Sequence, residues 1–225
     1  MATRFYFAST TGSAVNPAFS GSWNSSVSSV RRALTIPKGT TSIAIGTTIN
    51  VTQTPSAPEQ DRQYVGPPMH AFTLSGTVKG QIMTREFAVN DDVDQLYLGI
   101  RVCSNDGSTI RSPDALAVAN YGTAGEFINN ASCRNNILAN GDSLSSVTVS
   151  DGDRLVIEIG YRGLAGGASP QAAAKYGENA TDLPENQTQT TDGAGWIEFS
   201  QDIPVKVAVP IIILPRLGMG QEYRG

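Results

Sequence analysis

The sequence predicts an all-β protein, a jelly-roll-like β-sandwich, on two observations. In a series of short segments, such as residues 95–104 and 154–162, β-branched or aromatic residues alternate with polar ones. A period of two places one set of side chains on a core and the other towards water. The second observation is composition: 23 glycines, 12 prolines and only 16% charged residues are typical of a turn-rich β protein.

The first third of the chain, residues 1–60, is expected to form an N-terminal strand and an extended anchoring segment. Residues 3–7 show the alternation of a strand. The polar residues 8–29, interrupted by Phe19 and Trp23, predict an extended segment rather than a helix. Because the core strands are predicted downstream, deleting residues 1–29 is expected to leave a folded sandwich.

Residues 61–214 are predicted to form the sandwich itself. Residues 54–68, rich in proline, glutamine and glutamate, are expected to be a break that precedes it. Residues 164–194 are expected to be a projecting loop, and residues 215–225 a C-terminal tail. Strands are predicted at 32–36, 42–52, 70–76, 77–86, 95–104, 108–111, 114–119, 127–128, 145–150, 154–162, 195–203 and 205–214.

Charge and hydropathy exclude several classes of partner. The net charge of −4 and a pI of about 5.0 argue against nucleic acid, since binding to a duplex depends on basic residues that neutralise phosphates. The longest apolar run, residues 205–214, contains Lys206 and Pro210, so no membrane span is expected. The start of the chain lacks a secretory pattern, so we expect synthesis in a bacterial cytoplasm, with Cys103 and Cys133 as reduced thiols.

The residues that could carry catalysis have simpler interpretations. His70 is the only histidine, and no nucleophile elbow accompanies it, so no catalytic triad is predicted. Glu158 and Glu198 could flank a sugar, but both occupy alternating polar positions that favour solvent-facing side chains. No catalytic residue and no cofactor is predicted, and the protein is not expected to be an enzyme.

Two kinds of ligand site stay open on the sequence. Acidic turns at Asp91, Asp92 and Asp94, and at Asp106, Asp151 and Asp153, could supply oxygen ligands for calcium, although carboxylates that bond their own turn are commoner. Aromatic residues could stack on sugars, but aromatics in half-buried strands are mostly packing. The aromatic residues in question are Trp23, Trp196, Tyr64, Tyr97, Tyr121 and Tyr161.

Several segments, in a consistent order up to about Ser200, carry a family resemblance. They are residues 3–7, 16–19 with Trp23, 62–68, 75–81, 102–107, 152–162 and 196–200. On these the chain resembles a family of uncharacterised tailed-bacteriophage virion proteins. The resemblance implies a component of the particle, located on the capsid or on the tail, and it carries no catalytic motif.

Two functions follow from the resemblance and the architecture. The first is a capsid cement or decoration protein that bridges neighbouring capsomers, with the major capsid protein and further copies of itself, as a homotrimer, as partners. The alternative is a tail-fibre or receptor-binding module that recognises host surface glycan. Residues predicted to anchor one subunit to another, with the intrachain core as their alternative place, are Phe5, Tyr6, Phe19, Trp23, Ile211, Ile212, Ile213 and Leu214.

Overall fold

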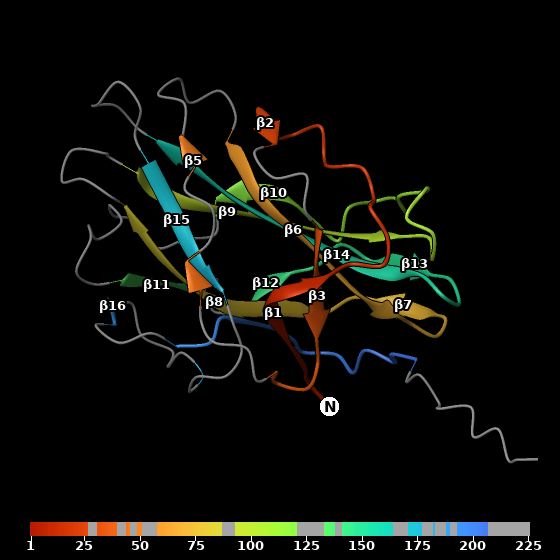
Figure 1. Ribbon diagram of the computed structural model, residues 1–225. Coiled ribbons are helices and arrows are strands. Elements are labelled where there is room, and N and C mark those ends of the chain that lie inside the picture. Colours follow the sequence, from red (N-terminus) through yellow and green to blue (C-terminus); the bar gives the residue numbers. More distant parts are fainter. Residues whose placement is uncertain are drawn as a thin grey trace, which may run out of the picture.

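The predicted all-β class is confirmed. The computed structural model describes residues 1–26, 31–39, 44–45, 49–50, 58–86, 93–120, 133–137, 141–163, 171–176, 182, 188–189 and 193–206. Every regular element within these residues is a β-strand, and none of them is helical. The strands form one large curled sheet and a small second sheet, an arrangement consistent with a jelly-roll-like sandwich (Figure 1).

The order of strands in the large sheet places distant parts of the sequence side by side. From one edge to the other it runs through β10 (Leu116–Asn120), β9 (Val93–Cys103), β14 (Arg154–Gly163), β6 (Glu59–Pro68), β3 (Arg31–Thr35), β1 (Thr3–Gly12), β17 (Trp196–Phe199), β8 (Thr77–Glu86), β11 (Cys133–Ile137) and β16 (Thr188–Gln189). Off this path lie β2 (Ser25–Ser26), β4 (Ala44–Ile45), β5 (Ile49–Asn50), β12 (Asp142–Ser143) and β15 (Gln171–Tyr176). The small sheet pairs β7 (Phe72–Leu74) with β13 (Val147–Val149).

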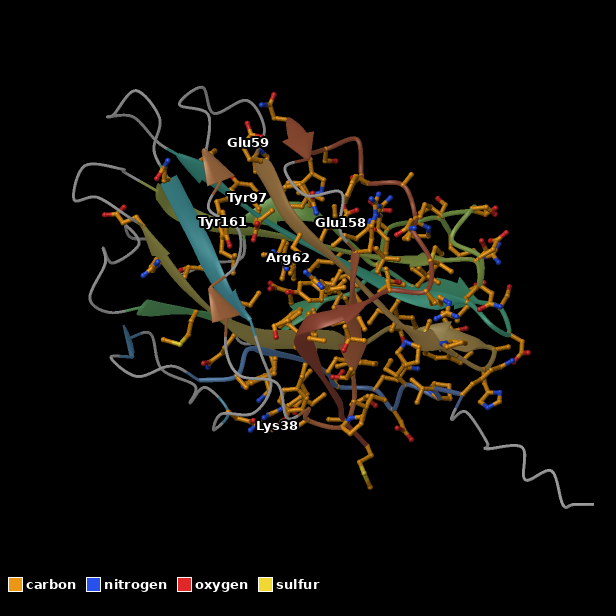
Figure 2. All side chains as sticks on the ribbon, in the orientation of Figure 1. Lys38, Glu59, Arg62, Tyr97, Glu158 and Tyr161 are labelled. Atoms are coloured by element: carbon orange, nitrogen blue, oxygen red, sulfur yellow. The ribbon has the colours of Figure 1, made fainter. Side chains whose placement is uncertain are left out.

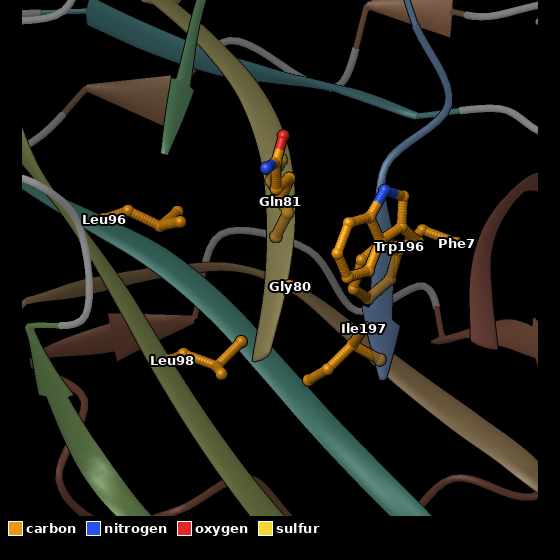
Figure 3. Close-up of a pocket in the computed structure, with 8 residues that line it drawn as sticks. Phe7, Gly80, Gln81, Leu96, Leu98, Trp196 and Ile197 are labelled. Atoms are coloured by element: carbon orange, nitrogen blue, oxygen red, sulfur yellow. The ribbon is translucent and has the colours of Figure 1, made fainter. Parts of the chain in front are cut away.

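The sheet curls so that its two halves enclose one hydrophobic core. Ile157 of β14 and Ile100 of β9 belong to the same buried cluster as Phe5 of β1 and Phe199 of β17, whose rings meet edge to face. A small cavity of about 10 Å³, roughly the size of one water, lies between the halves. Leu96 and Leu98 of β9 line one side of it, and residues of β1, β8 and β17 line the other (Figure 3).

The N-terminal residues are part of this sheet, contrary to the predicted division at residue 60. β1 lies between β3 and β17, and β3 joins β6 in parallel. Phe5 and Phe7 of β1 point into the core with exposed fractions of 0% and 1%. Deleting residues 1–29 would remove an interior strand of the sheet, so we now expect the shortened chain to lose the folded sandwich.

Three further differences from the prediction concern polar segments. The expected break at 54–68 contains β6, a ten-residue strand that pairs with β14 and β3. The expected loop at 164–194 contains β15, which pairs with β8, and Asp182, which bridges to Ala194. β11 also lies where no strand was predicted. The predicted strand at 127–128 and residues 207–225 lie outside the described residues.

Candidate functional site

A segment that we call the strap, residues 13–24, covers the outer face of the sheet over β6, β14 and β9. The Ser13 backbone N–H donates to the Arg31 carbonyl at 3.0 Å, and the Asn24 N–H donates to the Pro58 carbonyl at 2.8 Å. Between these ends the strap passes the β9 hairpin, where a Cβ on Gly107 would lie 3.2 Å from the Pro17 nitrogen. In Figure 1 the strap is the red-orange trace that leads from β1 to β2.

Glu158, in the middle of β14, fixes the strap to the sheet. Its side chain alternates with the core residues Ile157 and Ile159, so it projects from the outer face, where the strap buries it completely. Arg101 of β9 reaches one carboxylate oxygen with Nη2 at 2.5 Å, and Gln63 of β6 donates to the same oxygen at 2.9 Å. Gln63 is the cross-strand partner of Glu158 on β6. On β9 the cross-strand partner of Glu158 is Gly99, and Arg101 lies two residues further along that strand.

The strap supplies the remaining donors to this carboxylate. The Trp23 indole N–H donates to Oε2 at 2.7 Å, and the Ser20 backbone N–H lies 3.2 Å from both oxygens. Arg101 also donates to the Ala18 carbonyl at 2.7 Å. A buried carboxylate is stable only when it has an ion-pair partner and hydrogen-bond donors for its lone pairs. The Glu158 carboxylate has the Arg101 guanidinium as its ion-pair partner and accepts hydrogen bonds at both oxygens. We call Glu158, Arg101, Gln63 and Trp23 the buried clasp.

Two further contacts fit the strap closely to the sheet. Trp23 packs over Gly160, where an added Cβ would lie 2.6 Å from the indole ring, so only glycine leaves room for the ring. The Arg31 guanidinium lies 4.1 Å above the centre of the Phe19 ring and donates to Gln63 at 3.1 Å and to the Pro17 carbonyl at 3.3 Å. Burial lowers the pKa of Arg31, and the nearby Glu158 charge acts against that shift.

A second polar cluster lies on the outer face of β1 and β17, and we call it the open cluster. Asp182 accepts hydrogen bonds from Arg4 at 2.9 Å and from the Tyr6 hydroxyl at 3.0 Å, and Lys38 lies 2.5 Å away. Arg4 also pairs with Glu198 at 2.9 Å and stacks on the Trp196 ring at 3.9 Å. The arrangement ties a residue of the predicted loop 164–194 to the sheet.

Electrostatics in the open cluster favour the ionised form of Asp182. Partial burial works against the charged carboxylate, but the hydrogen bonds from Lys38, Tyr6 and Arg4 outweigh it and lower the pKa of Asp182. Burial, together with the bond to Asp182, raises the pKa of Tyr6. The cluster therefore combines a charged acceptor with the Tyr6 hydroxyl, a donor that keeps its proton at neutral pH.

An open groove of about 490 Å³ lies at the start of β1. Its floor is partly polar, because the Thr3 hydroxyl accepts from the Ile203 N–H at 2.8 Å and approaches Asp202 at 3.4 Å. Its walls include apolar side chains from three separate segments. The lining residues are Ala2, Thr3, Arg4, Tyr6, Ile36, Asp202, Ile203, Pro204 and Val205.

The predicted anchor residues fall into three groups. Phe5 and Trp23 are buried within their own chain, with exposed fractions of 0% and 8%, so neither is free to reach a neighbouring subunit in this fold. Tyr6 and Phe19 are partly exposed, Tyr6 in the open cluster and Phe19 under Arg31. Ile211, Ile212, Ile213 and Leu214 lie outside the described residues.

The glycosidase interpretation finds no support in the placement of its two carboxylates. The prediction that Glu158 faces solvent is wrong, because the strap covers it, and every donor around it belongs to the buried clasp or the strap. Glu198 instead faces Arg4 and Lys79. His70 is exposed and lies 3.4 Å from the Asp151 carboxylate on the surface.

The acidic turns considered for calcium have partners of their own where they are described. Asp153 accepts two hydrogen bonds from Arg111, at 2.8 and 2.7 Å, Asp106 accepts from Ser104 and Ser108, and Asp151 pairs with Lys206. Within the described part of the chain, no group of three potential metal ligands is found. Asp91 and Asp92 lie outside that part, as does the side chain of Asp94.

The aromatic residues do not share one face where their side chains are described. Tyr64 meets Phe7 inside the core, Trp23 points from the strap onto β14, and Trp196 lies in the open cluster beneath Arg4. Tyr161 is buried and donates to Asp61 at 3.2 Å, while Tyr97 lies beside Arg162. Tyr121 is outside the described residues.

Of the two cysteines, Cys103 is a free, buried thiol, and burial raises its pKa to about 11. Cys133 begins β11, but its side chain is outside the described part. The predicted reduced state of the pair therefore stays a prediction.

Sequence reasoning missed Arg101 and Gln63 as partners of Glu158. A partial signal was present: Arg101 is the only charged residue of 96–103, and Glu158 is the only charged residue of 155–161. In the described residues, no helix is long and apolar enough to cross a membrane.

Comparisons with known proteins place the chain in no established family. No protein-family profile and no curated protein matches it. A CocE/NonD family hydrolase from Staphylococcus aureus is similar over 77% of this chain at 10% identity and a TM-score of 0.47, and the chain spans about a third of it, 34%. The structure of infectious bursal disease virus, Gx strain, is similar over 78% of this chain and 44% of that one, at 10% identity and a TM-score of 0.24. Likenesses this weak carry no argument about function.

Proposed function

We propose that this protein is a non-catalytic structural component of a bacteriophage particle, a capsid cement or decoration protein. The observation that supports a structural role is how the chain uses its charged groups. Glu158 and Asp153 are buried with arginine partners, and Asp182 holds its own chain to the sheet. In the described residues, these carboxylates stabilise the fold instead of facing a pocket as catalytic acids or bases would.

Such a protein would act by adding contacts between neighbouring capsomers of the major capsid protein. A rigid body that binds two neighbours raises the free energy needed to separate them, by an amount set by its affinity for the assembled state. The clasped strap is consistent with this role, because it presents a fixed outer surface that loses little conformational entropy on binding.

The contacts with a partner must differ from those expected from the sequence alone. Phe5 and Trp23 pack within their own subunit, so the proposed contacts do not rest on them. The partly exposed Tyr6 and Phe19, and the apolar residues 211–214, remain as the proposed anchors. Further copies of the chain, as a homotrimer, and the virion as the location remain part of this proposal, with assembly in the host bacterial cytoplasm.

Co-sedimentation with capsid shells tests the proposal. We expect the purified protein to sediment with shells of the major capsid protein and to raise the temperature at which the shells dissociate. A heat-unfolded sample of the same protein is the control for nonspecific trapping. Failure to bind shells, combined with binding to purified host surface glycan, would contradict it and favour a receptor-binding tail module.

A further inference from the structure

The groove at the start of β1 lies beside the point at which the described part of the chain ends. Ile36 and Val205 line it, and both are apolar side chains that are only partly buried against the core. Partly buried apolar side chains gathered in one open groove can bury their remaining exposed surface against a further apolar segment.

The sequence supplies a segment of this kind directly after the groove. Residues 207–214 read Val-Ala-Val-Pro-Ile-Ile-Ile-Leu and contain no charged side chain. At about 3.3 Å per residue, such a segment can extend over roughly 26 Å, more than the length of an ordinary strand.

The direction of the chain at its described end argues against its own groove as the binding place. Residues 202–205 already form one wall of the groove. The Lys206 N–H then donates to the Pro68 carbonyl at 2.8 Å, and its ammonium group lies 2.5 Å from Asp151. Neither Pro68 nor Asp151 lines the groove.

A return into the same groove would need an immediate reversal after Lys206. Residues 207–209 are Val-Ala-Val, and the first residue of a type that commonly forms turns is Pro210, four positions after Lys206. A segment from another subunit meets no such restriction. The occupant is therefore expected to come from a second copy.

We propose that the groove lined by Ile36 and Val205 binds residues 207–214 of a second copy of this chain. The donor segment and the acceptor groove lie next to each other on each subunit, so each copy can give and receive at one contact region. Repeated head to tail, this exchange closes into a ring when the rotation between copies permits. The role of this exchange in a phage particle rests on the proposed function, whereas the contact itself needs only two copies of the chain.

Light scattering at micromolar concentration tests the exchange with three chains. The full chain is expected to be an oligomer, while a chain that ends at Lys206 and the full-length Ile36→Asp variant are expected to be monomers. Mixing these two should give a one-to-one dimer, because one retains the groove and the other the donor segment. Phe72→Asp is the matched control: Phe72 is also partly buried against the core but lies outside the groove, so this variant should still assemble.

The proposal is overturned if the full chain is monomeric, if the chain ending at Lys206 assembles like the full chain, or if the mixture stays monomeric. Should Ile36→Asp fail to fold, a labelled peptide of residues 207–216 added to the chain ending at Lys206 decides instead. Saturable binding, seen as a rise in fluorescence anisotropy, supports the groove, and its absence overturns it. Sedimentation of these chains with capsid shells is measured separately, so a monomer that still binds shells would remove the exchange and leave the proposed function intact.

Discussion

Two polar clusters hold chain segments against the sheet, and they differ chiefly in burial. In the buried clasp, the side chains of Arg101 and Glu158 are 7% and 1% exposed. In the open cluster, Lys38 and Asp182 are 32% and 30% exposed. Glu158 and Lys38 lie well apart in the molecule (Figure 2). We infer that burial, more than the number of partners, decides how much each cluster contributes to the fold.

The physical reason is what happens when one partner is removed. In the buried clasp the remaining charge stays in a water-excluded place without compensation, which is strongly unfavourable. In the open cluster, water and mobile ions take over much of the lost interaction. The two clusters therefore allow the same kind of substitution to be compared in one protein.

The largest effect is expected for Glu158→Leu, which leaves the Arg101 guanidinium buried and unpaired. The free energy of unfolding should fall by about 3–5 kcal/mol, measured by urea denaturation. Adding Arg101→Met should recover most of the loss, because the second substitution removes the stranded charge. A loss below about 1 kcal/mol for the single variant would contradict the burial argument.

A smaller loss is expected for Gly160→Ala, which tests the fit of the strap without changing a charge. The new methyl group would overlap the Trp23 ring and the Glu59 carbonyl oxygen. Overpacking of this kind costs about 1–3 kcal/mol, which thermal unfolding would record as a lower midpoint. Gly21→Ala is the control, because an added Cβ at Gly21 meets no atom within 4 Å. Equal midpoints for the two variants would count against a tightly packed strap.

The strands that the sequence predicted best are those whose core face is apolar. Residues 154–162 and 95–104 alternate cleanly, and they form the neighbouring strands β14 and β9. β6 was missed because Glu59–Gln63 are all polar, yet all are buried. Alternation cannot identify such a strand, since buried polar side chains such as Asp61 and Gln63 bond to residues far away in the sequence.

The same limit applies to the clasp. A glutamate at an alternating position within an apolar strand is consistent with solvent exposure, and only the strap, 135 residues away at Trp23, buries it. Local sequence carries no record of which distant segment covers a face. The interior position of β1 was hidden for the same reason, since its partners β3 and β17 are set by topology.

In the open cluster, Asp182→Asn should lower the free energy of unfolding by about 1 kcal/mol or less at neutral pH, because the partners are already partly hydrated. Urea denaturation of Asp182→Asn and Glu158→Leu under the same conditions compares their losses in the free energy of unfolding directly. A loss as large as that of Glu158→Leu would show that burial does not separate the two clusters.

The smallest predicted effect is a change in the pH dependence of stability. Because the folded protein holds the pKa of Asp182 below its unfolded value of about 3.9, the stabilisation is present above that value and is lost as the pH falls through the folded pKa. The difference between wild type and Asp182→Asn should therefore be largest near neutral pH and shrink as the pH falls below about 4. A difference that grows on acidification would contradict the assigned direction of the shift.

The claim that Glu158 fixes the strap to the sheet is tested most directly by hydrogen exchange at the Trp23 indole N–H. In the isolated wild-type protein in D₂O, we expect this proton, observed by NMR, to exchange more slowly than a free indole by on the order of a hundredfold or more. Glu158→Gln should remove much of that protection. Exchange at the rate of a free indole in the wild-type protein would show that the strap is not clasped and would contradict the account.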